Sequence, residues 1–139
     1  MAFSPDGSLL TTVDQTHPNV VWIWAMESKT RLMSAMVQEN PIRQVLWHPS
    51  RPELVITTAN NAIPAARWWS LDHGPAIIRI PISRSETGRY DVKWVVTQEH
   101  DYSKFWFGTA EESVVGYLIA DDGTPQFEVL NSLSGSNRT

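Results

Sequence analysis

The sequence has no cysteine, which excludes disulfide bonds and cysteine-ligated metal sites. It has no apolar run near the ~20 residues that a membrane-spanning helix needs, and its N-terminus lacks the charged-then-apolar order of a secretory signal. It also has no basic block, because acidic and basic residues are scattered and give a net charge of −4. Nucleic-acid binders usually carry a basic face. These absences predict a cytoplasmic protein that binds neither nucleic acid nor membrane.

Catalytic and cofactor-binding motifs are missing as well. No nucleophile elbow, Walker loop or dinucleotide-binding glycine pattern occurs. Asp121–Gly123 resembles part of a calcium loop without the later ligands, and Glu111–Glu112 is expected in a loop rather than as an acid–base pair. None of the four histidines is paired at metal-ligand spacing, and each is expected in a turn or at the surface: His17, His48, His73 and His100. The sequence therefore predicts no enzyme, metal or cofactor.

Helical periodicity of useful length is also absent, and nine prolines and seven glycines interrupt the chain at short intervals. Three stretches instead share one pattern, in which an apolar element with an aromatic residue is followed by a polar turn and further apolar runs: residues 2–24, 45–71 and 92–118. Phe3, Trp47 and Trp94 mark the starts, 44 and 47 residues apart, and Trp24 and Trp69 mark a later run, 45 apart. A period in the forties built of four short strands is typical of a β-propeller blade.

The predicted fold is all-β: a partial β-propeller of about three four-stranded blades. The blades are expected over residues 1–37, 41–83 and 89–131, within a domain at 1–132 followed by a flexible tail at 133–139. Ser4–Gly7 is expected to turn between the first two strands, because proline sets φ and glycine tolerates the closing angles.

The chain has seven tryptophans, which sit inside short apolar runs. Residues 21–24 are all apolar, and so are the adjacent Trp68 and Trp69. Because neighbouring side chains of a strand point to opposite faces, both faces of these strands are apolar. We therefore expect each of these strands to lie between two sheets.

The stretch over residues 3–24 resembles a WD repeat, from the end of its inner strand through the Ser-Pro-Asp-Gly turn to its tryptophan. It departs from the family in that no Gly-His dipeptide opens any repeat and Ala25 follows Trp24 where the family has Asp. The buried Asp of the preceding loop is also absent, so the family's Asp-His-Ser-Trp hydrogen-bond chain is not expected.

Residues 11–24, 41–56 and 75–81 are similar to the centrosomal and spindle-pole family called WD-repeat protein eight. This resemblance implies a non-enzymatic protein-interaction scaffold in the cytoskeleton, at the centrosome or spindle pole body. In that family the propeller works with a coiled-coil spindle-anchoring protein and, in fungi, a minus-end-directed kinesin, and it helps to anchor microtubule minus ends.

Members of this family have a complete propeller, so the resemblance implies that the chain is the C-terminal part of a larger one, or a shortened isoform or gene model. A truncated product without independent function stays an alternative. Three blades would leave two apolar faces open, one formed by some of residues 21–24 and the other by the last blade: Phe105, Trp106, Phe107, Val114 and Val115. We expect self-association, or pairing with missing blades supplied by another chain.

Connections between successive strands alternate between the two ends of a blade, so those at 15–19, 37–43 and 59–66 are expected on one rim. Functional residues of scaffolds often lie in such loops, and the loop at 59–66 is long and unusually apolar. The predicted partner-binding residues are Gln15, His17, Asn19, Asn60, Asn61 and Ile63. The alternative is that these loops are ordinary connections.

A function of another class would be a propeller enzyme or a small-ligand binder that uses polar residues of the central channel. The inner strands offer a small set for this purpose: Arg43, Gln44, Asp91 and Lys93.

Overall fold

The structure is a computed structural model that describes residues 1–59, 63–83, 89–95, 103–119 and 125–134. These residues form three four-stranded antiparallel sheets, in each of which the strands are neighbours in chain order. The first sheet contains β1 (Ala2–Phe3), β2 (Leu9–Asp14), β3 (His17–Met26) and β4 (Thr30–Val37). The second contains β5 (Ile42–Trp47), β6 (Glu53–Thr58), β7 (Ala65–Ser70) and β8 (Gly74–Arg79). The third contains β9 (Asp91–Val95), β10 (Lys104–Gly108), β11 (Glu112–Ile119) and β12 (Gln126–Ser134).

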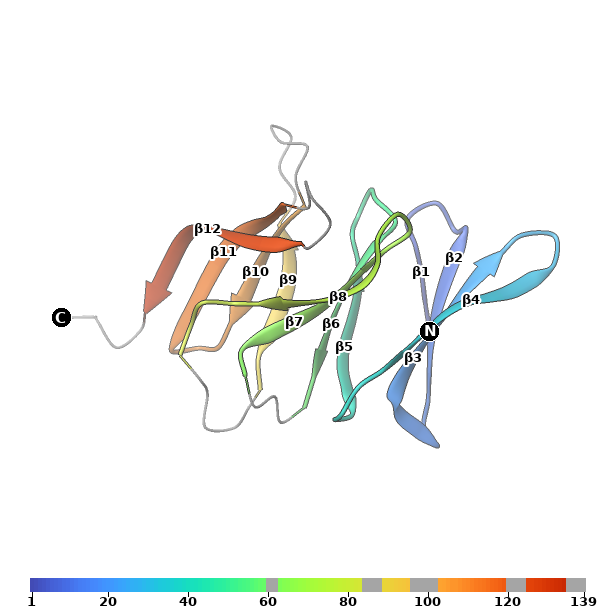
Figure 1. The fold of residues 1–139 in the computed structure, drawn as a ribbon, viewed down its shortest axis with the longest axis horizontal. Coiled ribbons are helices and arrows are strands. Elements are labelled where there is room, and N and C mark those ends of the chain that lie inside the picture. The colour runs from blue at the N-terminus through green and yellow to red at the C-terminus, as the bar shows by residue number, and fades with distance from the viewer. Residues whose placement is uncertain (60–62, 84–88, 96–102, 120–124, 135–139) are drawn as a thin grey trace.

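Figure 1 shows the three sheets side by side in chain order, with the first at the right and the third at the left. We call them the first, second and third blades. The prediction of an all-β partial propeller with three four-stranded blades is confirmed.

The last strand requires one correction to the expected boundaries. β12 continues to Ser134, because Leu133 and Ser134 pair with Ser113 and Glu112 of β11. Backbone pairing therefore places Leu133 and Ser134 in the sheet, although both were expected in the flexible tail. Residues 135–139 lie outside the described part of the chain.

The turn between β1 and β2 forms as its residue types predict. The Gly7 N–H donates to the Ser4 carbonyl at 3.0 Å, and Gly7 has a φ of 77°, which glycine adopts without strain. Asp6 Oδ1 accepts hydrogen bonds from the Ser8 N–H at 2.9 Å and from the Ser8 hydroxyl at 2.7 Å. The turn therefore closes with its own polar groups.

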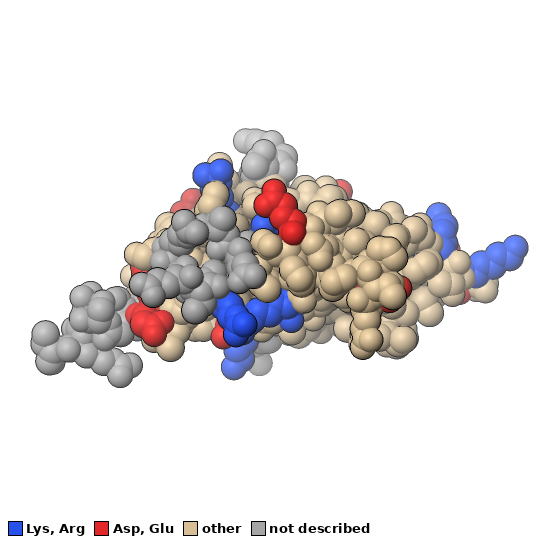
Figure 2. Space-filling view, turned by 90° about the horizontal axis from the view of Figure 1, so that it is seen from below, with Lys and Arg blue, Asp and Glu red and all other residues tan. Residues whose placement is uncertain are grey.

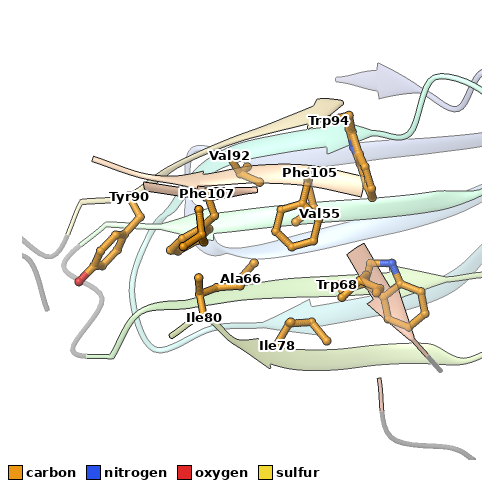
Figure 3. Packing of buried hydrophobic residues seen from close by; sticks show 12 residues of the cluster. Val55, Ala66, Trp68, Ile78, Ile80, Tyr90, Val92, Trp94, Phe105 and Phe107 are labelled. Atoms are coloured by element: carbon orange, nitrogen blue, oxygen red, sulfur yellow. The ribbon is translucent and has the colours of Figure 1, made fainter. Parts of the chain in front are cut away.

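Two apolar clusters fill the spaces between the blades. The cluster between the first and second blades consists of Leu9, Val21, Ile23, Ala25, Met36, Leu54, Ile56 and Trp69. The cluster between the second and third blades is shown in Figure 3, where Val55, Ala66, Trp68, Ile78 and Ile80 face Tyr90, Val92, Trp94, Phe105 and Phe107. Most of the buried apolar side chains thus lie where two blades pack against each other.

The adjacent tryptophans of β7 divide between these two clusters. Trp69 packs toward the first blade and Trp68 toward the third, and each is only 3% exposed. The prediction that this strand lies between two sheets is confirmed.

In the described structure β3 has a neighbouring sheet on one face only, so the expectation of two neighbouring sheets is wrong for this strand, whereas the expected open face formed by some of residues 21–24 is confirmed. Val21 and Ile23 are fully buried against the second blade. Trp22 and Trp24 point to the opposite face and are half-buried. In this blade Trp24 Nε1 donates to Thr12 Oγ1 at 3.0 Å.

The third blade also has a neighbouring sheet on only one face in the described structure, and this is the face that corresponds to the open one of the first blade. Phe105, Phe107 and Val114 are buried against the second blade, whereas Trp106 and Val115 on the far face are half-buried. The expected open face of this blade therefore contains Trp106 and Val115 but not Phe105, Phe107 and Val114.

Strand register shows that each blade carries two equivalent rows of side chains, one on each face. The head row, which in the second and third blades faces the preceding blade, is Phe3, Leu10 and Trp24, then Trp47, Leu54 and Trp69, then Trp94, Phe105 and Gly116. The tail row, on the other face, is Ala2, Thr11 and Ile23, then Leu46, Val55 and Trp68, then Lys93, Trp106 and Val115.

The same indole hydrogen bond joins each head row to the tail row before it. Trp47 Nε1 donates to the Ala2 carbonyl at 3.1 Å, and Trp94 Nε1 donates to the Leu46 carbonyl at 2.9 Å. A tryptophan at this position supplies a large apolar surface and one N–H donor, and both are used between the blades.

The third head row ends in Gly116, where the other two rows have a tryptophan. Phe127 of β12 occupies this place, with its ring centroid 5.0 Å from that of Phe105. A Cβ atom built on Gly116 would overlap the Phe127 ring and the Glu128 carbonyl. A side chain from the neighbouring strand thus fills the space that the missing tryptophan leaves.

We expect the Gly116→Ala substitution to lower the free energy of unfolding by ~1–3 kcal/mol, because the added methyl group overpacks this position. Urea denaturation followed by circular dichroism measures the change. The Ser132→Thr substitution also adds a methyl group to the third blade but at an exposed position, and we expect it to stay within ~0.5 kcal/mol of the unchanged chain. Equal stability of the Gly116→Ala variant would contradict the described packing of Phe127.

Candidate interaction surface

Three connections lie at the same end of the blades, the lower end in Figure 1: β2–β3, β4–β5 and β6–β7. We call this end the lower rim, and Figure 2 views the molecule from it. Over the described residues, acidic and basic side chains are scattered singly or in small groups rather than gathered by sign. The surface is therefore mixed in charge, which fits no single class of charged ligand.

The β2–β3 turn is held by its own side chains. The Thr16 N–H donates to Asp14 Oδ1 at 3.0 Å, and this bond holds the pKa of Asp14 below its ordinary value. His17 Nδ1 lies 3.0 Å from Thr16 Oγ1 and 4.0 Å from Asp14 Oδ2. The His17 side chain is 66% exposed, so a fixed turn presents it to solvent.

Asn19 joins this turn to the β4–β5 connection. Its Nδ2 donates to the Gln38 carbonyl at 3.3 Å and to the Glu39 carbonyl at 3.1 Å. The Gln38 N–H in turn donates to the Asn19 carbonyl at 2.9 Å. Asn19 is therefore a structural link of the rim, and its amide is already engaged.

Gln38 continues the link to the second blade. Its Oε1 accepts a hydrogen bond from Arg67 Nε at 3.0 Å, and Arg67 Nη1 also donates to the Ala65 carbonyl at 3.4 Å. Burial lowers the pKa of Arg67, whereas Glu39 acts in the opposite direction, and the guanidinium stays charged. Asn19, Gln38 and Arg67 thus form a polar path across the first two blades.

A second polar path joins the second and third blades through the inner strands. Arg43 Nη1 pairs with Asp91 and donates to the Tyr90 carbonyl at 2.8 Å. Gln44 Oε1 accepts from Thr57 Oγ1 and from the Val92 N–H, each at 3.0 Å. Arg43 and Gln44 of the second blade therefore contact the third blade, where Asp91 is one of the partners. These three polar residues of the inner strands join one blade to the next.

The structure places the predicted partner-binding residues as follows. Gln15, His17 and Asn19 lie on the lower rim, with the first two exposed. Ile63 follows at the β6–β7 connection and is 52% exposed. Asn60 and Asn61 lie outside the described residues. That these residues bind a partner stays a prediction.

Sequence reasoning missed Gln38 and Arg67. A usable signal was present for Arg67, because it is the only charged residue in the apolar strand β7 and a buried charge needs a partner. Gln38 had no such signal, since its role depends on Asn19 and Arg67, which are distant in sequence.

A notch of ≈ 290 Å³ lies between the second and third blades, lined by Arg51, Pro52, Glu53, Trp68, Ser70, Leu71, Asp72, His73, Ser103 and Leu118. Glu53 is its polar centre. Its carboxylate accepts from the Ser103 hydroxyl, 2.6 Å from each oxygen, and from Trp68 Nε1 at 3.1 Å. Arg51 Nη1 lies 3.9 Å from Glu53 Oε2. These contacts tie β6 and β7 to the segment before β10.

Ser70 and His73 in the notch contact each other, with the Ser70 Oγ 3.3 Å from His73 Nδ1. The Ser70 Oγ accepts from the His73 N–H at 2.9 Å, and the His73 ring lies 5.7 Å from that of Trp68. These contacts are local and fix the turn. Among the described residues, no group of three or more His, Asp or Glu side chains could hold a metal ion. A search of the same residues for a helix able to cross a membrane finds none.

The geometry defines three propeller blades joined by apolar faces and by polar paths at the rim. No protein-family model matches the chain. The chain is similar to an uncharacterized WD repeat-containing protein of Schizosaccharomyces pombe, with 24% identity over 141 residues that cover 94% of the chain and 29% of that protein. A stretch of 63 residues is 33% identical to the WD repeat-containing protein WRAP73 of Mus musculus and covers 45% of the chain and 13% of that protein.

Both relatives are WD repeat-containing proteins, and the similarities support the WD-repeat family for this chain. The chain corresponds to less than one third of the length of either relative. The similarity therefore supports a fold made of propeller blades and a general role in protein interaction.

A pH-dependent prediction follows from His48, which is buried. The His48 ring lies 4.8 Å from that of Trp94, its Nδ1 accepts from the Ser50 N–H at 3.0 Å, and burial lowers its pKa from the ordinary 6.5. As the pH falls below 6.5, the unfolded chain binds a proton that the folded chain resists. The free energy of unfolding should therefore decrease between about pH 7.5 and 5.5.

The His48→Asn variant isolates this contribution, because its Oδ1 can still accept from the Ser50 N–H. We expect lower stability for this variant at neutral pH and a smaller loss on acidification than in the unchanged chain, measured by urea denaturation at each pH. Parallel pH profiles would show that His48 does not contribute.

Proposed function

We propose that the protein is a non-enzymatic scaffold that binds another protein through the lower rim. The observation that carries this proposal is the three-bladed fold together with the similarity to two WD repeat-containing proteins. The polar paths support the choice of rim, since connections that are already fixed lose little conformational freedom on binding. Exposed His17 and Ile63 would provide a ring and an apolar side chain for contact.

The finer proposal is an adaptor at the centrosome or spindle pole body that helps to anchor microtubule minus ends. Its support is the resemblance of residues 11–24, 41–56 and 75–81 to the spindle-pole WD-repeat family. The proposed partners are a coiled-coil spindle-anchoring protein and a minus-end-directed kinesin. The proposed location is the cytoskeleton.

The rim is tested by a double variant, His17→Ala with Ile63→Ala, co-expressed with the coiled-coil anchoring protein of the same organism. We expect reduced co-purification of the partner, because two exposed contact side chains are removed. The fold should survive, since exposed loop substitutions usually cost within ~0.5 kcal/mol.

The matched control is Leu71→Ala, which removes an exposed apolar side chain from the β7–β8 turn at the other end of the blade. It should bind like the unchanged chain. Equal binding by the double variant would exclude the rim, whereas no binding by the unchanged chain would exclude this partner and leave the scaffold role open.

A further inference from the structure

We propose that the chain associates with a second copy of itself head to tail, with the first blade of one copy docked on the third blade of the other. This inference does not depend on the lower rim or on its partner. It rests on the two blade faces that no other sheet covers in the described structure, and on their equivalence to faces that already pack together inside the chain.

The open head face belongs to the first blade. Its row is Phe3, Leu10 and Trp24, and Leu32 of β4 lies beside Trp24. Phe3 is 54% exposed and Leu32 is 45% exposed, whereas Trp24 is half-buried. Leu10, between Phe3 and Trp24, is buried at 8% exposure, so Phe3, Leu32 and part of Trp24 are the apolar surface that faces solvent. Exposed apolar surface of this kind is typical of an interaction site.

The open tail face belongs to the third blade, and it carries a shallow, open depression. A depression of ≈ 580 Å³ is lined by Lys93, Trp94, Val95, Trp106 and Val115. Its walls are apolar apart from Lys93, which is exposed at its edge.

The register shows what such a depression receives elsewhere in the molecule. In the second blade the equivalent tail row is Leu46, Val55 and Trp68, and the indole of Trp94 packs against this row and donates to the Leu46 carbonyl. In the first blade the indole of Trp47 donates to the equivalent Ala2 carbonyl. The side chain in the third depression should therefore come from a head row, at the position of Trp47 and Trp94.

Phe3 is the residue at this position on the open head face, because it pairs with Leu10 as Trp47 pairs with Leu54. Docking would place its ring in the depression, where Trp106 and Val115 would cover it. The Phe3 side chain has no N–H group, so the Lys93 carbonyl would not receive the indole hydrogen bond that the Ala2 and Leu46 carbonyls receive. The contact between copies is thus an apolar version of the contact between blades.

Sedimentation velocity and light scattering on the purified chain test the association over a wide concentration range. We expect reversible species with masses that are multiples of 15.7 kDa, since a head-to-tail contact leaves one free face at each end. A monomer at every concentration would overturn the proposal.

Two charge substitutions block the two faces separately: Phe3→Glu on the head and Trp106→Glu on the tail. Each should weaken association at least about tenfold, because a charge would be buried in an apolar contact. Circular dichroism checks the fold of each variant, and Val115→Glu, in the same tail row, replaces Trp106→Glu if that variant does not fold. Ile77→Glu, at an exposed site on the outer strand of the second blade, is the control and should associate like the unchanged chain.

Mixing the two blocked variants gives the sharpest result. The Phe3→Glu chain keeps its tail and the Trp106→Glu chain keeps its head, so together they should form a one-to-one dimer that does not grow further. Homodimers of either variant alone, or no dimer in the mixture, would show that the contact is not head to tail.

The Phe3→Trp variant tests directly whether the side chain at position 3 lies in the contact, since it supplies the indole donor that the other two blades have. We expect it to tighten association by about 2- to 10-fold, the usual net gain from one hydrogen bond. Weaker association of this variant would place Phe3 outside the contact.

Discussion

The packing of a head row on a tail row is the interaction on which the rest of the structure depends. A four-stranded blade is apolar on both faces and cannot bury either of them by itself. Burial of Trp94 contributes about 1.5–3 kcal/mol, and the half-buried Trp47 contributes less. The indole hydrogen bond of each fixes where the blade lies. The rim contacts, the notch and the open faces all follow from this one repeated arrangement.

The three blades share equivalent strand positions more closely than they share the side chains at those positions. The third tail row begins with Lys93 where the second has Leu46, and the third head row has Gly116 with Phe127 in place of a tryptophan. Trp24 bonds to Thr12, and Glu53 holds Trp68 and Ser103. Polar contacts within and between the blades thus differ from blade to blade, although the blades share one register.

The sequence allowed the fold to be predicted because the period is carried by large aromatic residues. The spacing of Trp24 and Trp69 identified equivalent positions. The registers confirm this, because Trp24 pairs with Leu10 and Trp69 pairs with the equivalent Leu54. Contacts between distant residues could not be predicted, such as the path from Asn19 through Gln38 to Arg67. The alternation of connections placed Gln15, His17 and Asn19 on one rim, but a pattern of loops does not identify what binds there.

Hydrogen exchange of the tryptophan indole N–H groups, followed by nitrogen-15 NMR, tests the central claim most directly. If head rows pack on tail rows as described, the indole N–H groups of Trp47 and Trp94 should be strongly protected. Both should lose this protection together as denaturant is added, because the two contacts hold one stack of blades. Exchange of either indole at the rate of free tryptophan under native conditions would contradict the account.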